Sequence, residues 1–278
     1  MVVRLIVTDL DGTLIDHHTY SADAARAALE GARVAGVPVV PCSSKTLAEM
    51  QAVAGRLALA AAPLIVENGS AVWFPDAWSV QPSVWGGRPT IPYAGGQVLV
   101  LGVDAEWLRP KLAAVAAAAG VDVRGFSRMT DEEVARRTGL SLEVATLARQ
   151  RQFSEPFVCE SGAGDLPALD AAARTIGARV TRGGRFFHLI GPTDKGDAVH
   201  VVRATCQPGA RLLGLGDAPN DLSLLLACDD AAIIPQPAAG LDPDLVRALP
   251  AASHASDPGP SGWNAIVLDW LERTAPPR

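Results

Sequence analysis

The sequence predicts an α/β protein built on a doubly wound parallel sheet, with a second α/β domain inserted into it. Short apolar segments such as 5–7 and 211–215 alternate with helix-like segments, as expected for the buried strands of a parallel sheet. Between residues 75 and 96 the composition shifts toward Pro, Gly and Trp, which indicates a domain boundary. A Gly-Gly pair at 183–184 predicts a tight hairpin that closes the inserted unit.

These boundaries divide the 278 residues into three parts. We expect residues 1–88 to form the first part of a core, 89–190 an inserted α/β cap domain, and 191–278 the second part of the core. Residues 97–102 are expected to open the inserted unit as its first strand. Within it, Thr130 and Ser141 have the residue types and positions of helix N-caps.

The composition indicates a well-folded globular protein rather than a disordered one. Hydrophobic residues make up 49% of the chain and charged residues 19%, so a well-filled core is expected. The net charge of −6 argues against a partner held by nucleic-acid phosphates. No apolar run approaches the length of a membrane span, and residues 1–7 are too short for the apolar core of a signal peptide. We therefore expect a soluble cytoplasmic protein with no membrane or nucleic-acid partner, whose oligomeric state the sequence leaves open.

Two carboxylates, Asp9 and Asp11, follow the first apolar strand in the segment Asp9-Leu10-Asp11-Gly12-Thr13. Open α/β sheets bind ligands at the carboxyl ends of their strands. Two like charges this close are costly unless a cation neutralises them, and Mg²⁺ prefers hard carboxylate oxygens. One carboxylate can then attack phosphorus while the other transfers a proton. The alternative interpretation of this segment is an ordinary turn at the end of a strand.

The same segment resembles the first motif, DxDGT, of the haloacid dehalogenase superfamily. This resemblance implies a phosphoryl-transfer enzyme in which Asp9 is the nucleophile and Asp11 transfers the proton. The second motif of the superfamily, a Ser or Thr that binds the transferring phosphate, is matched by Ser43 or by Ser44 at the end of the next strand. After a third strand, Asn68 is expected to face the phosphate, although Asn-Gly also predicts a hairpin turn.

Two later motifs complete the resemblance. Lys195 follows a strand and opens a helix, where it is expected to offset the charge of Asp9 and of the phosphate. Residues 216–221 match the fourth motif, GDxxND, whose carboxylates complete a Mg²⁺ site, with Asn220 on the phosphate side or orienting the metal ligands. The metal ligands that the resemblance implies are Asp9, Asp11, Asp217 and Asp221.

Several short segments are similar to those of mannosyl-3-phosphoglycerate phosphatases within this superfamily. They are Ser44-Lys45-Thr46, Gln152–Phe157, Arg185–Leu189 and Gly214–Asp221. This similarity implies a HAD-like core with a cap of the C2 type, Cof-like, and the hydrolysis of mannosyl-3-phosphoglycerate to mannosylglycerate, a compatible solute. Glucosyl-3-phosphoglycerate and a broader range of sugar phosphates remain open as substrates. A non-catalytic phosphoglycoside-binding protein is the alternative from a different class.

Residues of the cap are expected to bind the glycerate carboxylate and the sugar hydroxyls of such a substrate. The planar guanidinium of arginine matches a carboxylate. The candidates for the carboxylate are Arg151, Arg185 and His188. The candidates for the sugar hydroxyls are Gln152, Ser154 and Glu155. Each of these residues has an alternative interpretation as an ordinary surface or turn residue.

Overall fold

The computed structural model describes residues 3–78, 80, 82–160, 162, 164–183, 186–206 and 209–276. Its central feature is a parallel sheet of five strands in the order β13-β12-β11-β1-β2. These strands are β1 (Arg4–Thr8), β2 (Val39–Pro41), β11 (Arg211–Gly216), β12 (Asp230–Ile233) and β13 (Ser253–His254). Because β1 lies between β11 and β2, its residues Leu5, Ile6 and Val7 are completely buried. The predicted parallel sheet is therefore confirmed.

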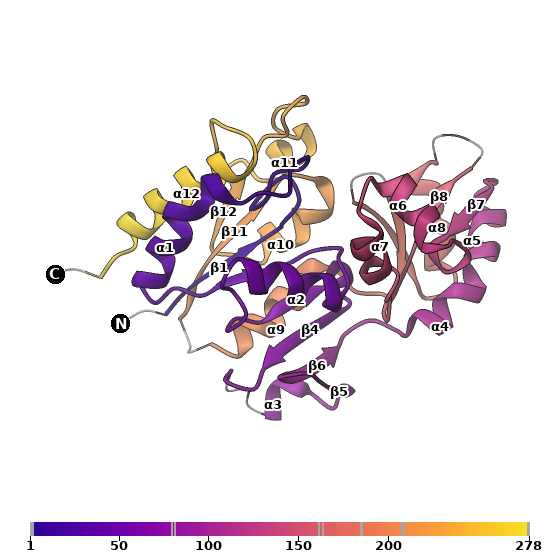
Figure 1. The fold of residues 1–278 in the computed structure, drawn as a ribbon, viewed down its shortest axis with the longest axis horizontal. Coiled ribbons are helices and arrows are strands. Elements are labelled where there is room, and N and C mark those ends of the chain that lie inside the picture. Colours follow the sequence, from indigo (N-terminus) through magenta and orange to yellow (C-terminus); the bar gives the residue numbers. More distant parts are fainter. Residues whose placement is uncertain are drawn as a thin grey trace.

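Helices cover both faces of this sheet, as a doubly wound fold requires (Figure 1). Ile6 packs in one apolar cluster with α1, α2 and α12, whereas Leu5 and Val7 pack in another with α9, α10 and α11. Successive side chains of a strand point to opposite faces, so three residues of β1 serve both layers. The helices are α1 (Arg26–Val34), α2 (Leu47–Arg56), α9 (Lys195–Ala204), α10 (Leu222–Leu226), α11 (Pro243–Ala248) and α12 (Gly259–Arg273).

A second, antiparallel sheet of four strands extends the core, in the order β3-β4-β6-β5. Its strands are β3 (Leu64–Val66), β4 (Ala71–Pro75), β5 (Thr90–Tyr93) and β6 (Gly96–Val100), with the short helix α3 (Pro82–Trp85) between β4 and β5. A parallel bridge between Cys42 and Ile65 connects it to the end of β2. The strand expected at residues 97–102 therefore does not open the cap, because β6 pairs with β4 and buries Val98 and Leu99 in the core clusters. The division expected at residues 88 and 89 falls inside this sheet, and we propose instead that the cap begins near Gly102.

The cap is a separate antiparallel sheet in the order β7-β8-β10-β9, which lies beside the core (Figure 1). Its strands are β7 (Val123–Gly125), β8 (Ser154–Cys159), β9 (Arg179–Gly183) and β10 (Phe186–Ile190). The helices α4 (Ala105–Leu108), α5 (Leu112–Ala118) and α8 (Leu166–Arg174) pack in one apolar cluster with this sheet, and α6 (Asp131–Thr138) packs in another. Alongside α6 lies α7 (Leu142–Ala148).

Local signals in the cap sequence predicted several of its turns and helix ends. Thr130 and Glu133 form a capping box at the start of α6, and the Ser141 side chain caps α7, so both predicted N-caps are confirmed. Gly183 pairs with Phe186 across the β9-β10 hairpin, while Gly184 of the expected Gly-Gly turn lies outside the described residues. In the described part of the chain, no helix has the length and apolarity needed to cross a membrane.

Candidate active site

Polar residues follow β1, β2 and β11, which are neighbouring parallel strands of the core sheet. Asp9 comes directly after β1, Ser43 lies two residues beyond β2, and Asp217 comes directly after β11. The carboxyl ends of adjacent parallel strands meet at one edge of the sheet, so the fold brings these side chains together. All three are at least nine-tenths buried. Asp217 is thus brought beside two residues that precede it by more than 170 positions in the chain.

Lys195 is the cation at the centre of this site. It is the first residue of α9, its side chain is 1% exposed, and its Nζ lies 2.6 Å from Oδ1 of Asp9 and 2.6 Å from Oδ1 of Asp221. Burial alone would lower the pKa of Lys195, but Asp221 and Asp9 raise it well above its ordinary value. Lys195 is therefore a fixed positive charge beside Asp9, where the sequence predicted it.

Three buried carboxylates, those of Asp9, Asp217 and Asp221, offer oxygens that all lie within 4.8 Å of one another. Thr13 Oγ1 donates to Oδ1 of Asp217 at 3.2 Å, and Gln236 Nε2 donates to Oδ2 at 3.2 Å. Burial, followed by the charge of Asp221, raises the pKa of Asp217 to about 7. Three carboxylates beside one ammonium leave excess negative charge, and an all-oxygen donor set suits Mg²⁺. The chemistry of these residues fits a divalent cation.

Asp11 is not part of this group of three carboxylates. Its Oδ2 lies 2.8 Å from Nζ of Lys45, and its Oδ1 is buried without a hydrogen-bond partner. Gly12, with φ +84°, turns the chain so closely past Asp217 that an added Cβ would lie 2.9 Å from Oδ2 of Asp217. Asp11 lines the cavity but stands apart from the three carboxylates that could hold a metal ion, so the structure does not support the metal-binding role expected for it.

The four residues expected to bind phosphate divide into two groups. Ser43, Ser44 and Asn220 line the cavity above Asp9, whereas Asn68 is 98% buried behind it. The backbone N–H of Asn68 donates to the carbonyl oxygen of Ser43 at 3.0 Å, and its side-chain amide has no partner among the described residues. The backbone of Asn68 is therefore tied to the loop that carries Ser43, and its side chain is not part of the cavity wall. Phosphate binding by the other three stays a prediction.

The carboxylates open into a cavity of about 550 Å³ between the core and the cap. Its wall includes Asp9, Asp11 and Asp217 from the core and Phe186 and His188 from the cap. A cavity of this size accommodates a small phosphorylated molecule. Because both domains form its wall, a molecule bound in this cavity would contact residues of the cap as well as of the core.

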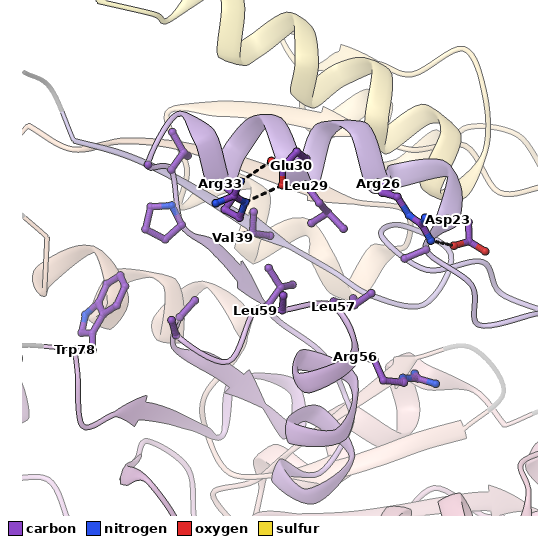
Figure 2. A pocket seen from close by; sticks show the side chains of 17 residues that line it. Asp23, Arg26, Leu29, Glu30, Arg33, Val39, Arg56, Leu57, Leu59 and Trp78 are labelled. Atoms are coloured by element: carbon purple, nitrogen blue, oxygen red, sulfur yellow. Dashed lines mark hydrogen bonds and ion pairs between the residues drawn. The ribbon is translucent and has the colours of Figure 1, made fainter.

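A second cavity, of about 560 Å³, lies between α1 and the loop after α2 (Figure 2). Its lining includes the residues that lead into β2, at the opposite end of that strand from Ser43. Two of its arginines, both on α1, form ion pairs. Arg33 pairs with Glu30 of the same helix, and Arg26 pairs with Asp23 just before the helix. It combines surface ion pairs with leucine and alanine side chains and gathers no group of carboxylates, so we place the active site in the first cavity.

Arg151, expected to bind the substrate carboxylate, joins the cap to the core. Its Nε donates to the carbonyl oxygen of Ala148 at 2.7 Å and one terminal nitrogen donates to that of Ser44 at 2.5 Å. The other terminal nitrogen lies 3.5 Å from Oε2 of Glu49, which also closes the capping box of α2 with Thr46. The guanidinium is part of the cavity wall, but it is already bonded to oxygens of Ala148 and Ser44 and paired with Glu49.

Gln152 and Ser154, expected to bind sugar hydroxyls, instead contact a buried carboxylate of the core. Glu67 accepts hydrogen bonds from the backbone N–H of Gln152 at 3.0 Å, from that of Phe153 at 3.1 Å, and from the Ser154 hydroxyl. Neither Gln152 nor Ser154 lines the cavity. Burial raises the pKa of Glu67 above its ordinary value, against the opposing effect of Arg151. These two sugar-binding predictions are therefore not supported.

The remaining cap candidates have different outcomes. Glu155 lies inside the cap, where its carboxylate accepts hydrogen bonds from the backbone and hydroxyl of Ser127. His188 does line the cavity, but burial, then the charges of Arg151 and Lys195, lower its pKa to about 3. A neutral His188 supplies no cation for a carboxylate at neutral pH. Arg185 lies outside the described residues.

Sequence reasoning missed two residues that matter for this site, Lys45 and Glu67. Lys45 follows directly on the Ser43-Ser44 pair, and Glu67 directly follows β3, so each stands at a strand end where functional side chains gather. That position was the available signal. Their partners, Asp11 and the segment entering β8, lie far away in the sequence and could not be identified from it.

Residues 6–81 match the family of haloacid dehalogenase-like hydrolases. The chain is 33% identical over 272 residues to a glucosyl-3-phosphoglycerate/mannosyl-3-phosphoglycerate phosphatase of Methanococcoides burtonii, covering 96% of this chain and 97% of that one. It is 35% identical over 278 residues to a phosphatase of the same name from Persephonella marina, covering 97% and 98%.

Solved structures share the whole fold at low identity. A Thermoplasma acidophilum protein superposes with a TM-score of 0.69 at 16% identity, covering 98% of this chain and 99% of that one. The sucrose-phosphatase of Synechocystis superposes with a TM-score of 0.62 at 14% identity, covering 98% of both. These structures show the shared fold, and the two near full-length relatives show the family. The chain belongs to the haloacid dehalogenase-like hydrolases, in the family of the glucosyl-3-phosphoglycerate/mannosyl-3-phosphoglycerate phosphatases, and it is a phosphoric monoester hydrolase.

Proposed function

We propose that the protein is a Mg²⁺-dependent phosphatase that hydrolyses mannosyl-3-phosphoglycerate to mannosylglycerate and phosphate, a step in compatible-solute synthesis. Glucosyl-3-phosphoglycerate is the alternative substrate, because both glycosides appear in the names of the two relatives. The observation that carries the proposal is the placement of Asp9. Its carboxylate is held by Lys195 at the base of a cavity that the cap completes.

In the proposed reaction Asp9 attacks the phosphorus atom in line with the glycerate oxygen. The bond from phosphorus to that oxygen breaks, the oxygen takes a proton from Asp11, and an aspartyl-phosphate forms on Asp9. Asp11 then removes a proton from water, whose oxygen attacks phosphorus and releases Asp9 and inorganic phosphate. Lys195 and Ser43 stabilise the negative charge on the phosphoryl oxygens.

The carboxylates of Asp9, Asp217 and Asp221 would hold the Mg²⁺ ion in this proposal. The ion would supply additional positive charge beside the phosphoryl oxygens. Supporting this assignment, the three side chains share a buried site in which a single ammonium, that of Lys195, does not balance their charge. A non-catalytic phosphoglycoside-binding protein would have no need of Asp9 and Lys195 in contact at the base of the cavity.

The test is Mg²⁺-dependent phosphate release from four compounds: mannosyl-3-phosphoglycerate, its glucosyl analogue, 3-phosphoglycerate and mannose 6-phosphate. We expect the two glycosyl-phosphoglycerates to give the highest kcat/KM. Similar values on all four would leave a general sugar-phosphate phosphatase and overturn the proposed substrate. Asp9→Asn should abolish turnover while circular dichroism shows an intact fold, and an active Asp9→Asn protein would overturn the nucleophile.

A further inference from the structure

Two permanently charged cations, Lys45 and Arg151, line the described wall of the active-site cavity. Arg151 already donates to the carbonyl oxygens of Ala148 and Ser44 and lies against Glu49. Its guanidinium therefore holds the cap to the core. Among the described residues of the wall, Lys45 is the Lys or Arg that remains to meet a negatively charged part of the substrate other than the phosphate.

Lys45 reaches the cavity from the loop between β2 and α2, directly after the serines expected to bind phosphate. Its side chain is 13% exposed, and its Nζ lies 2.8 Å from Oδ2 of Asp11 and 5.5 Å from the centre of the Tyr20 ring. The backbone N–H of Lys45 donates to Oγ of Ser43 at 3.3 Å, and its carbonyl oxygen accepts from Glu67 at 3.0 Å. Both ends of the residue are thus fixed, with the ammonium at the cavity wall.

An ammonium group has three N–H donors, and the contact with Asp11 uses one of them. The others are available to a second acceptor. A carboxylate forms the strongest hydrogen bond with this ammonium, because both groups are charged and the site is largely shielded from water.

The proposed substrate places a carboxylate close to this ammonium. In a 3-phosphoglycerate ester, the carboxylate is separated by two C–C bonds, each about 1.5 Å long, from the carbon that bears the leaving oxygen. Asp11 donates its proton to that leaving oxygen, and Lys45 is in direct contact with Asp11. A leaving oxygen next to Asp11 therefore brings the glycerate carboxylate to the neighbourhood of Lys45.

We propose that Lys45 binds the carboxylate of the leaving glycerate and makes the enzyme selective for phosphate esters whose leaving group is anionic. This inference rests on the proposed function and assigns Lys45 the part expected from Arg151. Lys45 then gives the enzyme its preference for phosphoglycerate esters over phosphate esters with an uncharged sugar as the leaving group.

The test pairs two substrates with three proteins. The substrates are the glycosyl-3-phosphoglycerate that the wild-type enzyme turns over and the same compound with its carboxylate converted to a carboxamide. The proteins are wild type, Lys45→Met, which removes the ammonium group and keeps the rest of an unbranched side chain, and Lys45→Arg, which keeps the charge. Melting temperatures confirm that each variant is folded. Binding of the dephosphorylated glycosylglycerate is measured by calorimetry as a readout that does not depend on turnover.

We expect wild type to prefer the acid over the amide by roughly 10- to 100-fold in kcat/KM, the range for a charge-assisted contact. Lys45→Met should remove this preference, chiefly through KM, and should weaken binding of the glycosylglycerate by a similar factor. Lys45→Arg should retain part of the preference. These results together would establish the contact.

An equal loss on acid and amide in Lys45→Met, appearing in kcat, would show that Lys45 acts only by orienting Asp11, and would overturn the inference while leaving the proposed function intact. If Lys45→Met does not fold, Lys45→Arg and the wild-type preference for the acid over the amide decide. A wild type without that preference also overturns the inference. A wild-type enzyme inactive on glycosyl-phosphoglycerates but active on other phosphate esters would overturn the proposed function and this inference together.

Discussion

Glu67, which directly follows β3 of the core, accepts a hydrogen bond from the hydroxyl of Ser154, the first residue of β8 in the cap. The same carboxylate accepts the backbone N–H groups of Gln152 and Phe153, so three donors from the chain entering β8 meet one buried acceptor. Glu67 is 1% exposed, and its neighbour Asn68 is hydrogen-bonded to the Ser43 loop. The junction between the two domains is thus part of the active-site framework.

Replacing Glu67 with Gln should destabilise the protein. A glutamine amide presents a single oxygen to three donors, and its NH₂ group would face a donor, so we expect a loss of about 1–3 kcal/mol in the free energy of unfolding. Urea denaturation measures this. Gln152→Ala is the matched control, because the side chain of Gln152 is exposed and the hydrogen bond from Gln152 to Glu67 comes from its backbone N–H. A change of similar size in both variants would contradict the role assigned to the Glu67 carboxylate.

The core half of the candidate site was predictable from the sequence, because strand ends of a parallel sheet meet at one edge whatever their separation along the chain. That rule brought Asp9, Ser43 and Asp217 together correctly. It could not say what polar residues of the cap would contact, since Ser154 finds its partner 87 residues away on another sheet. Glu155 points into the cap because successive strand residues face opposite sides.

The boundary of the cap was missed for a related reason. The composition of residues 75–96 indicates a break in regular structure, and the chain does leave the antiparallel sheet after β4, forms α3, and returns to the same sheet in β5 and β6. Hydrophobicity alone does not reveal that β6 pairs with β4, because a strand that closes one sheet and a strand that opens another have the same pattern. Long-range pairing decided the boundary.

Gly69→Ala should reduce activity by displacing Lys195. Gly69 has φ +86°, and an added Cβ would lie 2.1 Å from the carbonyl oxygen of Asp194 and 2.7 Å from the backbone nitrogen of Lys195. Because those atoms belong to the start of α9, the chain there must move, and a shift of about 1 Å at a catalytic group can cost roughly 100-fold in rate. Steady-state phosphate release measures the change in kcat.

Gly36→Ala is the control for the Gly69 variant. Gly36 has φ +64°, so it imposes a comparable left-handed conformation on alanine, but nothing lies within 4 Å of its added Cβ. We expect a small loss of stability and an unchanged kcat. If the two variants lose the same activity, close packing against α9 is not what fixes Lys195.

The buried imidazole of His188 should make the protein less stable as the pH falls. Burial and the charges of Arg151 and Lys195 lower its pKa to about 3 in the folded protein, whereas in the unfolded chain its pKa is near its ordinary value of 6.5. Between these values the unfolded chain binds the extra proton, so stability is fully present above pH 6.5 and is lost as the pH falls toward 3. The expected slope is about 1.4 kcal/mol per pH unit.

Urea denaturation of wild type and His188→Gln at pH 7, 6 and 5 measures this slope. The two proteins should differ most in pH dependence below pH 6.5, with the wild type losing more stability. His200→Gln, on the exposed side of α9, should follow the wild type. Parallel curves for wild type and His188→Gln would mean that His188 is not held neutral in the folded protein.

Replacing Asp217 with Asn should have opposite effects on the stability of the protein without and with Mg²⁺. Without metal, the three crowded carboxylates of Asp9, Asp217 and Asp221 repel one another, and burial and Asp221 raise the pKa of Asp217 to about 7. Removing one charge relieves this repulsion, so the variant in EDTA should be at least as stable as the wild type. With Mg²⁺ the order should reverse, because the variant has lost one of the proposed metal ligands. A ligand that binds only the folded protein, present at 100 times its Kd, adds about 2.7 kcal/mol to the free energy of unfolding. Differential scanning fluorimetry with and without Mg²⁺ measures both effects.

Asp244→Asn, in an exposed ion pair with Arg247 on α11, is the control and should keep the wild-type response to Mg²⁺. An undiminished Mg²⁺ response in Asp217→Asn would remove Asp217 from the proposed metal ligands, and a wild type indifferent to Mg²⁺ would contradict the site as a whole.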